Sequence, residues 1–173
     1  MLNMYPFAMV EQADVPPPPS GYLLWHLSLR WRVAMDRALS PLGLTHAQYA
    51  VVASLYSMER GGAKPSQRQL ADFSGLEPMY VSRLARTLEA AGMLERRHNP
   101  ADPRAVQMSL TQKGAETVAA AVGMVRDLEE RHMRPLGGMD SPEALELRRS
   151  LVTLLDHARA LAATPAPDSL PAR

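Results

Sequence analysis

The chain has 173 residues and a mass of 19.0 kDa, which suits one domain with short arms better than two full cores. Hydrophobic residues make up 46% of it and its formal net charge is only +1, so it can bury a core while its overall charge indicates no particular partner. The absence of cysteine excludes disulfides, thiol catalysis and thiolate metal sites. An apolar run of the roughly 18 residues that a membrane span needs is absent, as is the basic start of a secretory signal, so we expect a cytoplasmic protein.

Prolines separate the two ends of the chain from a helical middle. Four consecutive prolines close residues 1–19, which predicts an arm, and the proline-rich residues 163–173 predict a flexible tail. Between them, apolar residues recur at helical spacing, and Ser20, Thr45, Ser66 and Thr111 precede helices as capping residues. The predicted helices span about residues 21–39, 46–59, 67–74, 78–91, 112–133 and 142–162.

After the fourth predicted helix the apolar period changes from helical to alternating. Residues 93–97 can form one strand, and residues 106–110 can form a returning strand with one buried face. The stretch 98–104 contains two prolines and predicts the turn between the strands. The element order therefore predicts a mainly α fold with a small β-hairpin.

The third and fourth predicted helices are short and joined by a tight turn containing glycine, which is typical of a helix-turn-helix. Val81, Leu84, Ala85 and Leu88 form one apolar stripe along the fourth helix and leave a polar, cationic face opposite. Such a face can enter the DNA major groove, where arginines bind guanine edges or phosphates. A solvated amphipathic helix would show the same pattern, so this helix alone leaves both interpretations open.

The distribution of charge favours DNA. Residues 60–113 hold nine Lys or Arg against five Asp or Glu, whereas the segments on either side are net negative. Arg96 and Arg97 lead into the predicted turn and Arg104 follows it, and an arginine on a thin hairpin can enter a minor groove.

The ordered motifs resemble the MarR family of bacterial transcription regulators. They are LGLTHAQYAVVASL at 42–55, SQRQLADFSGLEPMYVSRLARTLEAAGMLERR at 66–97, DPR at 102–104 and SLTQKG at 109–114. The resemblance covers about residues 20–162. It implies a winged helix-turn-helix over 42–111 and dimerisation helices over 20–40 and 112–162. The family's hairpin often carries Asp-Arg-Arg, and Pro103 replaces the middle residue here.

What the resemblance implies is a homodimeric transcription regulator, a repressor, that binds a near-palindromic operator on double-stranded DNA. Wide apolar surfaces on the first and sixth predicted helices support a dimer independently. The candidate DNA-binding residues are Ser66, Gln67, Met79, Tyr80, Ser82, Arg83, Arg86, Arg96, Arg97 and Arg104. The alternative is a winged-helix protein-interaction module without sequence-specific DNA binding. Met79 and Tyr80 favour this alternative, because apolar residues on that face suit a protein partner.

Effector binding is also implied by the resemblance, with a small aromatic or anionic molecule releasing the DNA. Trp25, His26, Arg30 and Tyr49 lie on the helices that would line its cleft, although the sequence favours core positions for the aromatic residues and a solvated face for the polar ones. The five histidines are scattered without ligand spacing, so we expect neither a metal nor a cofactor. The sequence shows no nucleophile–base pair and no phosphate-binding loop, which predicts that the protein is not an enzyme.

Overall fold

The computed structural model describes residues 17–99 and 102–163, and the side chains of residues 98–105 lie outside this description. The predicted arm and tail therefore fall almost entirely outside the described residues, as does the tip of the hairpin. The described elements are α1 (Ser20–Leu39), η1 (Ser40–Leu42), α2 (His46–Arg60), α3 (Gln67–Ser74), α4 (Pro78–Ala90), β1 (Leu94–Asn99), β2 (Asp102–Leu110), α5 (Gln112–Met133), η2 (Arg134–Leu136) and α6 (Pro142–Ala163).

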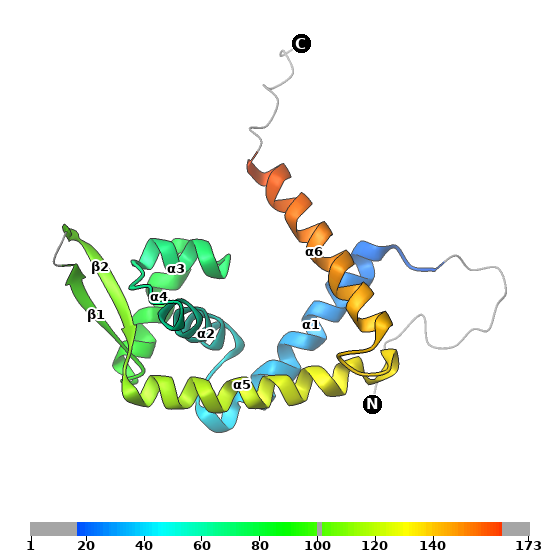
Figure 1. Cartoon of the computed structure of the whole chain (residues 1–173), viewed down its shortest axis with the longest axis horizontal. Helices are drawn as coiled ribbons and strands as arrows, with labels where there is room; N and C mark the ends of the chain where they lie inside the picture. Colours follow the sequence, from blue (N-terminus) through cyan, green and yellow to red (C-terminus); the bar gives the residue numbers. More distant parts are fainter. Residues whose placement is uncertain (1–16, 100–101, 164–173) are drawn as a thin grey trace, which may run out of the picture.

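The elements form a lobe and a helical arm, which is distinct from the predicted N-terminal arm, and one long helix joins the two. Helices α2, α3 and α4 and the hairpin make up the lobe, and α5 runs from the base of the hairpin to α1 and α6, which form the arm (Figure 1). Helix α6 then turns away from the rest of the molecule (Figure 1). This arrangement confirms the predicted mainly α fold with a β-hairpin wing.

The helix starts follow from local capping. Thr45 and Ser66 each form a capping box with the glutamine three residues on, and the Thr111 side chain accepts the N–H of Gly114 at the start of α5. Ser20 is different, because it lies inside α1, whose N-cap is Pro19 and has no side-chain hydrogen bond. The prediction that Ser20 caps this helix is therefore wrong.

The hydrophobic core lies where α2, α4, α5 and the hairpin meet. The apolar stripe predicted on α4 is buried, and the largest fully buried side chains include Leu39, Leu55, Leu70, Leu88 and Leu94. The apolar spacing of residues 67–74 predicts that Phe73 joins this core together with Leu70 and Ala71, but Phe73 is instead 56% exposed. At 100° per residue, its Cβ lies about 110° around α3 from the midpoint between Leu70 and Ala71, which carry the buried face.

The hairpin is longer than predicted. Leu94 pairs with Leu110 and Asn99 pairs with Asp102, so the strands continue through most of the stretch predicted as a turn. Pro103 lies in β2, where a two-stranded hairpin tolerates a residue that lacks an N–H. The hairpin is also hydrogen-bonded to the segment before α3, because the Met108 N–H donates to the Pro65 carbonyl at 2.9 Å.

Helix α6 contrasts with the lobe in its exposure. Among its side chains from 142 to 161, which the structure describes, only Ala144 is buried, and every residue from 148 to 161 is exposed. Its exposed apolar side chains are Leu145, Leu151, Val152, Leu154, Leu155 and Leu161. None of the helices in the described part is both long and apolar enough to cross a membrane.

Candidate nucleic-acid interface

Helix α4 presents a polar face that the rest of the lobe leaves open. Glu77 begins the helix by accepting the N–H of Tyr80 at 2.8 Å, and Pro78 occupies the first helical position. With the apolar stripe held in the core, Met79, Arg83 and Arg86 project from the opposite side. A surface hollow of about 510 Å³ covers this face and is lined by Glu77, Met79, Tyr80, Arg83, Arg86 and Thr87.

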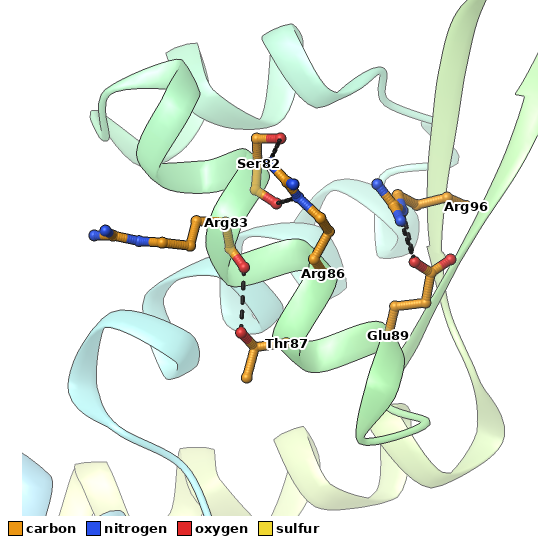
Figure 2. A network of polar contacts seen from close by, with 6 residues as sticks. All are labelled: Ser82, Arg83, Arg86, Thr87, Glu89 and Arg96. Carbon is orange, nitrogen blue, oxygen red and sulfur yellow. Dashed lines mark hydrogen bonds and ion pairs between the residues drawn. The ribbon is translucent and has the colours of Figure 1, made fainter.

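The two arginines of α4 are held differently. The guanidinium carbon of Arg83 lies 5.0 Å from the centroid of the Tyr80 ring, and its side chain extends away from the helix (Figure 2). Arg86 turns back along the helix, where its Nη2 lies 3.4 Å from the hydroxyl of Ser82 (Figure 2). Arg83 is thus free to donate all its N–H groups outward, whereas Arg86 must release Ser82 to do so.

Arg96 has a partner that the sequence did not suggest. It projects from β1 towards Glu89 near the end of α4 and forms an ion pair with it, including a 2.8 Å hydrogen bond from Nε (Figure 2). The hydrogen bonds from Arg96 lower the pKa of the Glu89 carboxyl. This ion pair ties α4 to the hairpin, so Arg96 positions these two elements relative to each other.

The remaining candidate residues lie around this face. Ser66 and Gln67 stand at the start of α3, where the Ser66 hydroxyl accepts the N–H of Gln69 at 3.3 Å. Arg97 lies on β1, remains largely exposed and pairs with Glu95 of the same strand at 2.9 Å. Arg104 belongs to β2, and its side chain lies outside the described residues.

Glu59 is a polar residue at the base of the hairpin that sequence reasoning missed. Its carboxylate accepts the N–H of Leu110 at 2.9 Å and so joins α2 to β2. Burial raises the pKa of Glu59 and the nearby Glu95 adds to this, while the Leu110 hydrogen bond opposes it. A bond between residues so far apart leaves no periodic signal in the sequence.

Three of the four effector candidates lie on α1, and the fourth, Tyr49, lies on α2. Trp25 is 58% exposed and packs edge-on against His26, Arg30 lies along a shallow hollow of α1, and Tyr49 is half-buried against the core. Burial, followed by the charge of Glu129, raises the pKa of Tyr49. Their role in effector binding stays a prediction. Among the described residues, no group of three His, Asp or Glu side chains could hold a metal ion.

A different, apolar cleft of about 340 Å³ opens between α1, α5 and α6. Its lining residues are Leu24, Leu27, Ser28, Trp31, Glu129, Met133, Ala144, Leu147, Arg148 and Leu151. The cleft therefore sits in the arm, and none of the four effector candidates lines it.

Comparisons with known proteins agree on one family. The model of the MarR family matches residues 44–106. The HTH-type transcriptional regulator YdcH of Bacillus subtilis is 39% identical over 110 residues, covering 64% of this chain and 75% of that protein. An HTH-type transcriptional repressor of Mycobacterium tuberculosis is 30% identical over 136 residues, covering 79% of this chain and 93% of that protein.

Solved structures show the same fold. The MepR–DNA complex of Staphylococcus aureus superposes with a TM-score of 0.71 at 22% identity, covering 82% of this chain and 99% of that chain. The transcriptional repressor CouR bound to a DNA duplex gives a TM-score of 0.66 at 26% identity, covering 82% and 92% of the two chains. These relatives are regulators and not enzymes, which confirms the prediction on catalysis. The chain belongs to the MarR family and is a transcription regulator of the winged-helix type.

Proposed function

We propose that the protein binds a near-palindromic operator on double-stranded DNA as a homodimer and represses transcription there. The observation that carries this proposal is the open face of α4, on which Arg83 projects outward beside a hairpin held by the Glu89–Arg96 ion pair. A helix in the major groove needs such a cationic face over an apolar back, and a wing held beside it extends the contact along the duplex.

The arm supports the homodimer. Apolar side chains stay exposed along both α1 and α6, including Leu23, Leu27, Leu154 and Leu155. Apolar surface on this scale is costly to leave in water, and a second copy supplies a surface of matching chemistry through a two-fold axis. Two copies of α4 would then meet successive major grooves about 34 Å apart, which requires two half-sites one helical turn apart.

The repressor role rests on relatives whose names state it, among them the mycobacterial protein with 30% identity. A dimer bound over a promoter excludes RNA polymerase, so occupancy alone suffices for repression. Release by a small aromatic or anionic effector completes the proposal. The arm cleft is mostly apolar and carries one cation, Arg148, and one anion, Glu129, so its lining suits a small aromatic effector that has a polar group.

The test begins with selection of genomic fragments bound by the full chain, followed by fluorescence anisotropy on the selected duplex and on a scrambled one over a salt series. We expect selective, salt-steep binding that Arg83→Ala weakens. Arg149→Ala is the matched control, because this α6 arginine pairs with Glu146 and lies away from α4. Binding of scrambled and selected duplexes with equal affinity would contradict the proposal.

The oligomeric state is measured separately by sedimentation equilibrium. We expect the wild type to be a dimer and Leu155→Glu to shift it towards monomer, because the charge would have to be buried in the interface. A reporter under the selected promoter tests repression, which we expect to be lost in Arg83→Ala.

The alternative function is a winged-helix module that binds a protein. Met79 favours it, since this large apolar side chain is 70% exposed at the start of α4. A fragment selection without any preferred site, together with a stable dimer, would favour this alternative over DNA binding.

A further inference from the structure

The side chain of Met79 is the most exposed large apolar group in the described part of the chain. It is the second residue of α4 and 70% exposed. The N-terminal residues of a helix that enters the major groove are those that contact base edges. Met79 therefore stands where sequence is read, yet it can form no ordinary hydrogen bond with a base.

The surroundings of Met79 are polar and carry two cations and one anion, Glu77, whose carboxylate is engaged in accepting the Tyr80 N–H. Arg83 lies one helical turn further along the same face and Arg86 two turns further, and Ser82 and Thr87 flank them. Tyr80 is half-buried and its ring is covered by Arg83. An apolar patch for a protein partner would be broader than one methionine between arginines. The face instead matches a ligand that is anionic and carries a single apolar group.

The major groove of DNA offers that combination. Its phosphates are negative, and among the four bases only thymine places an apolar group, the C5-methyl, on the groove edge. We propose that Met79 contacts the C5-methyl of one thymine in each operator half-site, and that Arg83 donates to a guanine near it. This inference rests on the proposed function and adds the base that the helix selects.

The spacing of the two bases follows from helix geometry. Arg83 follows Met79 by four positions, which is about 6 Å along the helix axis. Successive base pairs rise by about 3.4 Å, so the guanine lies about two base pairs from the thymine when the helix follows the groove. Stacking on Tyr80 holds the Arg83 guanidinium in the same hollow that Met79 lines, so both contacts can form together.

The experiment removes only the methyl group. In the operator obtained by fragment selection, each thymine is replaced in turn by uracil, which keeps the base pair and loses the C5-methyl. We expect one position per half-site at which this replacement weakens binding about three- to fivefold. At that position, a cytosine pair should bind more weakly than the thymine pair, and 5-methylcytosine should recover part of the loss.

Protein variants assign the effect to the side chain. In Met79→Ala the wild-type duplex should bind more weakly, and the uracil replacement should cost nothing further, because the contact is already missing. Phe73→Ala is the matched control, since it removes another exposed apolar side chain, from α3, that does not line the hollow. This control should keep the full uracil effect, and circular dichroism shows that both variants remain folded.

Two results would overturn the inference while the proposed function stands. One is a selected operator whose binding depends on Arg83 but in which no thymine methyl matters. The other is a uracil effect of the same size in Met79→Ala and in the wild type. If selection yields no preferred site at all, the proposed function itself fails, and this inference fails with it.

Discussion

Two glycines of α5 should respond oppositely to the same substitution. Gly114 lies in the first turn of the helix and packs against the turn between α4 and β1. A Cβ added there would lie 1.8 Å from the carbonyl oxygen of Met93 and 2.8 Å from its carbonyl carbon. Gly123 lies in the middle of the same helix, and a Cβ there would have nothing within 4 Å.

The cost of Gly114→Ala follows from what must move. Cβ atoms in proteins almost never come within 3.0 Å of a heavy atom outside their own and neighbouring residues. The start of α5 and the Met93 carbonyl must therefore separate by about 1.2 Å. Three hydrogen bonds oppose this, from the Thr111 N–H to Met93 at 3.1 Å, the Thr111 hydroxyl to Gly92 at 2.7 Å and the Lys113 ammonium to Ala91 at 2.8 Å.

Losing these bonds costs about 1 kcal/mol each, and forcing extra volume into a packed contact costs about 1–3 kcal/mol. Alanine returns about 1 kcal/mol through its higher helix propensity. We therefore expect Gly114→Ala to lower the free energy of unfolding by about 3–5 kcal/mol. Gly123→Ala has no such contact to break and should raise it by about 0.5–1 kcal/mol.

Urea unfolding at one fixed protein concentration measures both variants, because a dimer's apparent stability depends on concentration. The expected result is a lower midpoint for Gly114→Ala and a higher one for Gly123→Ala. A Gly114→Ala midpoint equal to that of the wild type would refute the close approach between α5 and the turn before β1. Equal losses in both variants would show that contacts of α5 with a second copy, and not the Met93 carbonyl, determine the cost of an added Cβ.

Three further predictions concern the DNA-facing side of the lobe. Arg83→Ala and Arg86→Ala should each weaken binding of the selected duplex by about 1–3 kcal/mol and of a scrambled duplex by less, as anisotropy can show. Burial raises the pKa of Glu59, so this group lowers stability as pH rises through its folded-state pKa. Glu59→Gln should therefore flatten the decline in urea midpoint as the pH rises above the ordinary carboxyl pKa of 4.5. Its hydrogen bonds with Arg96 lower the pKa of Glu89, so that group stabilises above its unfolded pKa, and this stability is lost as pH falls through its folded pKa. Glu89→Gln should also release the Arg96 guanidinium and make the salt dependence of DNA binding steeper by about one ion, and an unchanged slope would show that the released Arg96 does not reach a phosphate.

The elements that the sequence predicted well are those set by neighbouring residues. The capping boxes at Thr45 and Ser66 start α2 and α3 at the predicted residues, and Thr111 does the same for α5. These capping hydrogen bonds join residues within one helical turn, so the local sequence is sufficient to predict them. The prediction that Phe73 is buried was wrong, because an eight-residue helix carries too few apolar positions to define which of its faces is buried.

The site shows the same division between local and distant interactions. The outward face of α4 was predictable, because the periodicity of its buried stripe determines which side chains point away. The partner of Arg96 was not, since Glu89 lies on the other side of a helix end and a turn. In the sequence Arg96 is one more cation near the hairpin, and only the packing of α4 against β1 brings it to a carboxylate.

Helix α5 connects the open face of α4, which we propose reads DNA, to the arm. Its first turn is hydrogen-bonded to the turn between α4 and β1, and the Glu89–Arg96 pair joins those two elements beyond the turn. At its other end, His132 stacks against Trp31 of α1 with ring centroids 4.6 Å apart. A continuous helix of 22 residues bends little compared with a loop, so it transmits displacement over its length. In the proposed homodimer, the distance between the two copies of α4 therefore depends on the angle between α5 and α1, and any molecule that changes this angle changes the fit to two half-sites.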